Sequence, residues 1–192
     1  MKPQAQHERC TKNDCRRLFA GSAEELLWLC RTLTGNDELS ERILDAALEQ
    51  SLKGADSVFR DWMHSWARRL VIKVCVETMR PQTSDFSRGG YLVLTERMDP
   101  VDAGHLAAVL SLPSDVLQQR LLSLDVLSRF VFVLRAVEGY SRHETALLLN
   151  IDAMACEWHY VAAAQSLEDQ DSASWAAGWN PGTSDNLALA RN

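Results

Sequence analysis

The chain has 192 residues, enough for one large domain or two small ones. Its 46% hydrophobic and 24% charged residues are typical of a globular protein. The net charge of −6 excludes a protein held to nucleic acid by overall charge alone, because counterion release from phosphates favours basic chains. Residues 1–99 have no net charge, and residues 100–192 hold the whole acidic excess.

The N-terminal part begins with a polar stretch. Residues 1–20 predict a flexible segment without a signal peptide. A helix over about 22–34 follows, in which Ser22 and Glu25 have the spacing of a capping box. Gly35 ends this helix, because glycine favours the position after a helical C-terminus.

Two further helices are predicted before the chain loses its periodicity. Asn36 or Asp37 caps the first of them, which Gly54 ends. The second runs over about 57–79 and ends before Pro81. Its apolar stripe predicts a buried face made of Phe59, Trp62, Met63, Trp66, Leu70 and Val74.

Residues 81–112 are predicted to form a linker between two helical domains, 21–80 and 113–168. A short helix over about 101–110 fits inside the linker. No strand pattern of useful length occurs in the chain. The predicted fold is therefore all-α, with two small helical domains.

The second domain ends in a helix-turn-helix pattern. Ser141 and Glu144 predict a capping box, and Asp152 predicts the N-cap of a last helix that ends near Leu167. Residues 169–192 are polar and predict a flexible tail.

Neither a catalytic nor a metal site is predicted. The five cysteines lack a second close pair for zinc, and no catalytic triad or glycine-rich phosphate loop is present. We therefore expect no metal, no cofactor and no enzymatic activity. Without an apolar run of the roughly 20 residues that a membrane span needs, we expect a cytoplasmic protein with reduced thiols.

The second half resembles the fourth region of the ECF class of bacterial sigma factors, of the sigma-70 family. Residues 129–151, "RFVFVLRAVEGYSRHETALLLNI", carry its pattern of an apolar helix, Glu-Gly-Tyr-Ser, a Glu, an Ala and a Leu-Leu pair. The matching residues are Glu138, Gly139, Tyr140, Ser141, Glu144, Ala146, Leu148 and Leu149. The resemblance implies a helix-turn-helix of the sigma region 4 type.

Residues 31–48 and 58–76 are similar to the family's second region. The first segment matches the acidic helix that binds RNA polymerase, and the second matches the helix that contacts the downstream (−10) promoter element. The resemblance implies RNA polymerase core and promoter DNA as partners. The candidate polymerase-binding residues, spaced three or four apart, are Glu38, Glu41, Asp45 and Glu49.

The candidate DNA-binding residues lie on the two helices that the resemblance assigns to promoter contact. They are Arg60, Arg68, Arg69 and Lys73, together with Arg142, His159 and Gln165. The last helix has no Lys or Arg, although recognition helices commonly use them to read guanine. Its Trp158 and Tyr160 raise a second hypothesis, a sigma-like module that binds an anti-sigma regulator without reading promoters.

Overall fold

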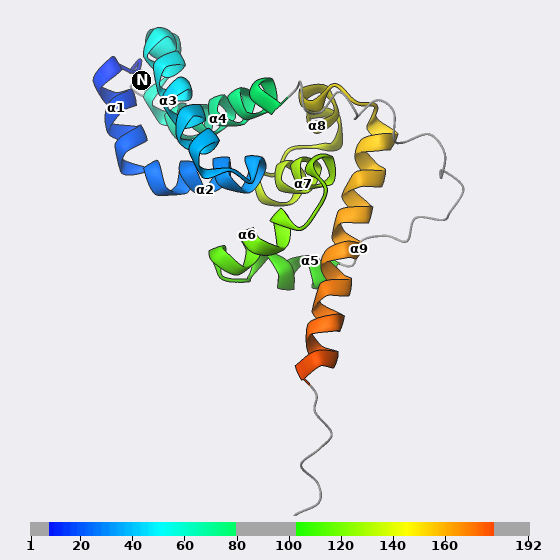
Figure 1. The fold of residues 1–192 in the computed structure, drawn as a ribbon. Coiled ribbons are helices and arrows are strands. Elements are labelled where there is room, and N and C mark those ends of the chain that lie inside the picture. Colours follow the sequence, from blue (N-terminus) through cyan, green and yellow to red (C-terminus); the bar gives the residue numbers. More distant parts are fainter. Residues whose placement is uncertain (1–7, 80–102, 179–192) are drawn as a thin grey trace, which may run out of the picture.

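The computed structural model describes residues 8–79 and 103–178, and in these residues every regular element is helical. One isolated β-bridge joins Arg9 to Phe59. The predicted all-α fold is therefore confirmed. Figure 1 shows two groups of helices, α1 to α4 and α5 to α9, packed side by side. Buried side chains from both groups form one apolar cluster.

In the first group of helices, glycines lie at or next to several helix ends. It comprises α1 (Lys12–Gly21), α2 (Ala23–Thr34), α3 (Asp37–Gly54) and α4 (Met63–Met79). Gly35 has φ of 68° and ends α2 as predicted. Asn36 caps α3, since its Oδ1 accepts a hydrogen bond from the Leu39 backbone N–H at 2.8 Å.

The predicted flexible N-terminus is wrong for the segment that forms α1. Thr11 and Asp14 make a reciprocal capping box, which holds the pKa of Asp14 at about 2 with further help from Arg60. Cys15, Leu18 and Phe19 are buried on one face and pack against α3 and α4. Three apolar side chains at helical spacing thus order a stretch that looks polar overall.

Two predictions around the following helices are also wrong. Ser22 makes no side-chain cap, because its backbone N–H instead terminates α1 on the Leu18 carbonyl at 2.8 Å. A 3-10 turn over Arg60–Trp62 precedes α4 and breaks the helical register there. Trp62 therefore leaves the apolar stripe, and 69% of its surface is exposed.

The second group begins inside the predicted linker. It comprises α5 (Ala103–Leu110), α6 (Ser114–Leu122), α7 (Val126–Phe132), a π-helical turn (Val133–Val137), α8 (Arg142–Leu149) and α9 (Ala153–Gly178). The short helix expected over about 101–110 is confirmed as α5. Residues 81–102 of the linker lie outside the described ranges. None of the described helices is both long and apolar enough to span a membrane.

The helix-turn-helix prediction is confirmed in its local geometry. Ser141 and Glu144 form the expected capping box at the start of α8. Asn150 adopts the left-handed conformation (φ 55°) and turns the chain. Asp152 then caps α9, since its Oδ1 accepts from the Ala155 N–H at 2.8 Å. However, α9 continues past its predicted end near Leu167, so the flexible-tail prediction is wrong for 169–178.

Candidate functional site

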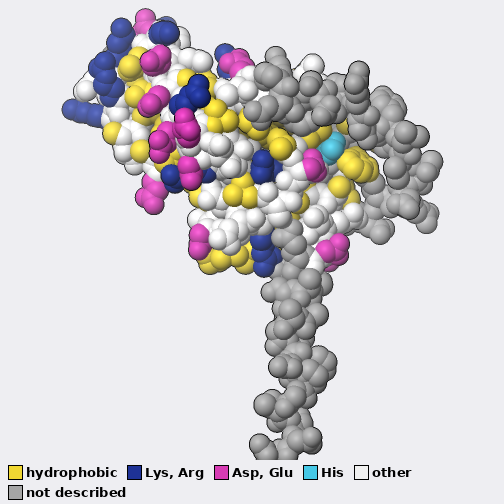
Figure 2. All heavy atoms as spheres, in the orientation of Figure 1, with side chains coloured by type: hydrophobic (Ala, Val, Ile, Leu, Met, Phe, Trp, Pro, Cys, Tyr) yellow, Lys and Arg dark blue, Asp and Glu magenta, His cyan; other side chains and the backbone are white. Residues whose placement is uncertain are grey.

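The acidic face of α3 consists of the four carboxylates predicted to bind polymerase. Glu38, Glu41, Asp45 and Glu49 are all exposed, whereas Ile43 and Ala47 on the opposite side of the helix are buried. None of the four pairs with a cation in the part of the chain that the structure describes. Figure 2 shows acidic side chains over the region where Figure 1 places α2 and α3. The face is available to a basic partner.

The four candidate cations in and before α4 have different surroundings. Arg60 lies in the 3-10 turn and pairs with Glu8 and Asp14 of the N-terminal segment. Lys73 is exposed, and its Nζ lies 3.9 Å from a Glu77 carboxylate oxygen one helical turn away. Arg69 is exposed as well. The structure therefore does not bring the four together as one free basic strip.

Arg68 is committed to an ion-pair network between the two helix groups. Its Nε donates to Glu138 Oε2 at 3.0 Å, a second guanidinium nitrogen bonds Glu138 Oε1, and a third bonds Glu25. The Glu138 side chain is only 5% exposed. The hydrogen bonds to Glu138 raise the pKa of Arg68 above its ordinary value. A cation predicted to touch DNA thus joins α4 to the turn before α8.

A polar cleft of about 390 Å³ surrounds this network. Its lining includes Ser65 and Arg69 from α4, and Tyr140 and Glu144 from the second group. The Arg69 guanidinium lies 5.9 Å from the centre of the Tyr140 ring, and burial raises the pKa of Tyr140. Backbone and side-chain hydrogen bonds at Ser141 lower the pKa of Glu144. The cleft holds more carboxylates than guanidinium groups, so the cleft as a whole does not concentrate positive charge.

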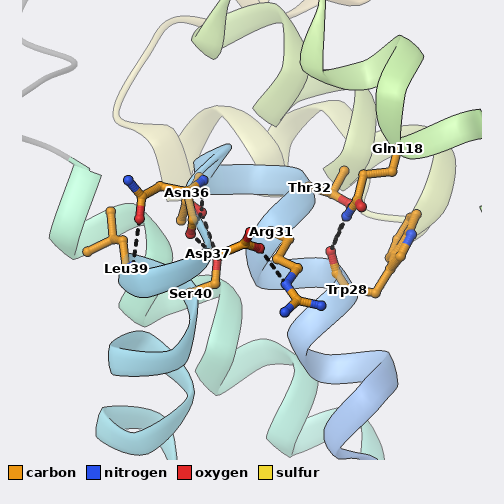
Figure 3. Close-up of polar contacts among 9 residues, drawn as sticks. Trp28, Arg31, Thr32, Asn36, Asp37, Leu39, Ser40 and Gln118 are labelled. Atoms are coloured by element: carbon orange, nitrogen blue, oxygen red, sulfur yellow. Dashed lines mark hydrogen bonds and ion pairs between the residues drawn. The ribbon is translucent and has the colours of Figure 1, made fainter. Parts of the chain in front are cut away.

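Hydrogen bonds between α2 and α6 provide a second contact between the groups (Figure 3). Trp28 Nε1 donates to the Ser114 carbonyl at 3.1 Å. Gln118 Nε2 donates to Thr32 Oγ1 at 3.0 Å and to the Trp28 carbonyl at 3.3 Å. These bonds position α6 along α2 and leave the acidic face of α3 uncovered.

Arg129 of α7 is the most deeply buried of the described cations, at 5% exposure. Its Nη1 donates to the Leu122 carbonyl at 3.4 Å, and its Nε has no partner among the described residues. Burial lowers its pKa, which nearby Asp125 partly opposes. A Cβ at Gly35 would lie 3.5 Å from the guanidinium, an ordinary contact distance, so the positive φ of Gly35 rather than lack of space favours glycine there.

The three candidate DNA-binding residues of the helix-turn-helix do not share one surface. Arg142 is half-buried at the start of α8, and Gln165 is exposed far along α9. His159 faces inward, where its Nδ1 lies 2.9 Å from Ser128 Oγ of α7. Burial lowers the pKa of His159, with a smaller opposing effect of Asp125. The imidazole of His159 is therefore engaged with α7 within the fold.

The aromatic and acidic residues of α9 also pack on the preceding helices. Glu157 Oε2 accepts from Arg135 Nη1 at 2.9 Å. Tyr160 stacks on Phe132 with ring centres 6.0 Å apart, and the Arg135 guanidinium lies 3.9 Å above the Tyr160 ring. The outer surface of the helix-turn-helix carries apolar side chains instead: Leu147 is 82% exposed and Met154 is 56% exposed.

Comparisons with known proteins add one similarity. No protein-family model matches the chain, and no curated protein matches it. The chain is similar to a solved structure described as "Structure of CnrH in complex with the cytosolic domain of CnrY", at 21% identity and a TM-score of 0.47. The match covers 83% of this chain and 88% of that chain. A similarity with this identity and TM-score assigns no function to the chain. A functional proposal must therefore be argued from the chain's own residues.

Proposed function

We propose that the chain is a sigma-factor-like transcription initiation protein that binds RNA polymerase core and contacts promoter DNA. The observation that carries the proposal is the fold of residues 138–151, the segment with the most specific resemblance to the sigma family. Its Gly139 turn (φ 71°) and its capping box at Ser141 and Glu144 produce the first helix of a helix-turn-helix. Sequence pattern and local geometry therefore agree in this segment.

Polymerase docking is assigned to the acidic face of α3. Four exposed carboxylates on one side of a helix favour a partner surface rich in Lys and Arg. Because the buried side of α3 is fixed by Ile43 and Ala47, the acidic face is presented rigidly. A preorganised charged face of this kind increases the rate and selectivity of docking more than its affinity.

Promoter contact is assigned to the exposed cations of α4, Arg69 and Lys73. Arg68 has a different role in this proposal, because its guanidinium is already bonded to Glu138 and Glu25. Since α9 has no Lys or Arg, the helix-turn-helix adds little phosphate attraction. Most of the binding free energy would come from the polymerase, so an acidic chain is compatible with promoter binding.

The test is co-purification of the full chain with RNA polymerase core, followed by a promoter-specific transcription assay. The double variant Glu41→Lys and Asp45→Lys should reduce recovery of core polymerase by about tenfold, because it reverses the charge of the docking face. Asp115→Lys, an exposed acid at the start of α6, is the matched control and should change recovery less than twofold, within the ~0.5 kcal/mol expected of a surface change. Recovery of no polymerase with the wild-type chain would reject the proposal.

A second candidate function is a sigma-like module that binds an anti-sigma regulator without reading promoters. The exposed Leu147 and Met154 favour it, because apolar side chains on a helix-turn-helix whose last helix has no Lys or Arg suit a protein partner better than DNA. This candidate predicts that the chain captures polymerase or a regulator but yields no promoter-specific transcript. Leu147→Glu with Met154→Glu should then abolish capture of the regulator.

A further inference from the structure

We propose that Cys10 and Cys15 form a binding site for one soft metal ion, Cu⁺, which their two thiolates coordinate in a linear arrangement. The inference goes beyond the proposed function and is independent of it. The argument against zinc is that this ion needs four ligands, and it does not apply to an ion that accepts two. Among the described residues, no group of three or more His, Cys, Asp or Glu side chains is placed to hold a metal.

The two thiols meet because of the way in which α1 begins. Thr11 is the N-cap, so Cys10 holds the position before the cap and Cys15 the fourth helical position. Apolar side chains at these two positions pack against each other in the hydrophobic staple that often accompanies a capping box. Thr11 and Asp14 form the capping box here, and the staple consists of two cysteines. Burial raises the pKa of Cys10, and the proximity of Cys15 raises it further.

Hydrogen bonds to three parts of the chain hold this arrangement in place. The Cys10 N–H donates to the Val58 carbonyl at 2.8 Å, and the Cys15 N–H donates to the Thr11 carbonyl at 3.1 Å. The Cys15 thiol donates to the Ser51 carbonyl of α3, 3.8 Å from its Sγ. Figure 1 shows the start of the described chain next to α3. The backbone around the two thiols is therefore fixed before an ion binds.

The burial of the site suits an ion that must enter it and then be protected from water. Cys15 is fully buried, Cys10 is 4% exposed, and both are free thiols. The segment that carries Cys10 is joined to the turn before α4 by one isolated β-bridge, between Arg9 and Phe59. Local opening of such a segment costs less free energy than opening of the core. A small displacement of residues 8–10 therefore gives an ion access to both sulfur atoms.

The chemistry of the site selects Cu⁺ among the common metal ions. Thiolates are soft ligands that favour Cu⁺ over hard ions such as Mg²⁺ and Ca²⁺. Binding forms two Cu–S bonds, releases both thiol protons to solvent and leaves one net negative charge on the complex. Burial, Cys15 and Asp14 raise the pKa of Cys10, whereas Arg60 lowers it. The Arg60 guanidinium is therefore close enough to offset part of the charge of the complex.

The experiment is a competition for Cu⁺ between the full chain and the coloured chelator bathocuproine disulfonate, under reducing conditions without oxygen. The wild-type chain should hold one Cu⁺, with two sulfur ligands in its X-ray absorption spectrum. The bound ion should also raise the midpoint of thermal unfolding. Cu⁺ retention should fall on acidification, because protons compete with the ion for both thiols.

Substitutions locate the site within the chain. Cys10→Ala and Cys15→Ala should each lose the ion to the chelator, because a single thiolate remains. Alanine keeps an apolar side chain in the staple, since a buried cysteine behaves as a small hydrophobic residue. Cys75→Ala is the matched control, because Cys75 is hydrogen-bonded to Cys30 in the other close pair of thiols. This variant should retain the ion as the wild type does.

Four results would overturn the inference. The wild-type chain would bind no Cu⁺, Cys10→Ala would retain the ion, Zn²⁺ would be held as tightly as Cu⁺, or Cys75→Ala alone would lose the ion. Circular dichroism checks that each variant keeps its helices, and if Cys15→Ala does not, Cys10→Ala decides the outcome. The assay contains neither polymerase nor DNA, so its failure and the failure of polymerase capture are separate results.

Discussion

The two helix groups use their charged side chains in opposite ways. In α1 to α4, the four carboxylates of the acidic face of α3 and the α1 cations Lys12, Arg16 and Arg17 are exposed, and none of them is in an ion pair within residues 8–79 and 103–178. In α5 to α9, Arg129 is buried, and Arg135 is bonded to Glu157 and stacked on Tyr160. The first group therefore leaves much of its charge exposed, whereas the second uses Arg129 and Arg135 in its own packing.

Arg68 lies at the border between these two uses. It comes from α4, but its strongest partner, Glu138, belongs to the second group. The contrast between Arg68 and the exposed cations of the same helix shows that the number of cations on a helix does not measure its capacity for phosphate contact. What matters is whether a carboxylate elsewhere in the fold already holds each cation, and substitutions in the two groups test this point.

The largest expected effect comes from Arg68. Arg68→Met leaves the buried Glu138 carboxylate without its ion-pair partner, which should reduce the free energy of unfolding by about 3 kcal/mol. Urea denaturation measures the change. The double variant Arg68→Met and Glu138→Gln should be more stable than the single variant, because no buried charge is left alone. Equal stability of wild type and Arg68→Met would show that the network contributes nothing.

Capping residues and glycines in the sequence predicted much of the fold, whereas contacts between residues distant in sequence could not be predicted. Gly35, Gly54 and the Ser141 capping box mark helix ends because the physical cause lies within a few residues. Glu138 is 70 residues from Arg68, and no spacing rule links them. Only the resemblance to the sigma family placed these two residues in functional segments at all.

The errors near the N-terminus have a local explanation. The signal for α1 was present as Thr11 and Asp14 at capping-box spacing, but an Asp in place of the usual Glu or Gln and only three buried apolar residues obscured it. Trp62 was misplaced because the helical pattern was extended through a 3-10 turn. The exposed cations of α1 can be placed on one side of a helix only after the helix itself is recognised.

A matched pair of arginines compares the two groups directly. Arg135→Met removes the bond to Glu157 and the contact with the Tyr160 ring, which should cost about 1–2 kcal/mol of stability. Arg16→Gln on the exposed side of α1 should change stability by less than about 0.5 kcal/mol. Thermal unfolding of both variants measures the difference. If the two costs were equal, the contrast between inward and outward charge would be wrong.

Two serines sharpen the distinction between a predicted cap and a formed one. Ser141→Ala removes the side-chain acceptor for the Glu144 N–H and should destabilise the chain by about 1 kcal/mol. Ser22→Ala should have almost no effect, since the Ser22 side chain makes no capping bond. Urea denaturation at neutral pH compares them. A similar loss at Ser22 would mean that both capping boxes form in solution.

The smallest expected effect is a pH dependence that belongs to the second group. Burial lowers the pKa of His159 below its ordinary value of 6.5, so just below pH 6.5 the unfolded chain binds more protons than the folded chain. Stability should therefore fall on acidification through that window and be fully present above it. His159→Asn keeps a polar group near Ser128 but removes the titration. The stability difference between about pH 5.5 and 7.5, measured by urea denaturation, should shrink in this variant.

The control is His143→Asn, at an exposed position on α8, which should retain the wild-type stability difference between the two pH values. An equal reduction in both variants would assign the titration to some other group.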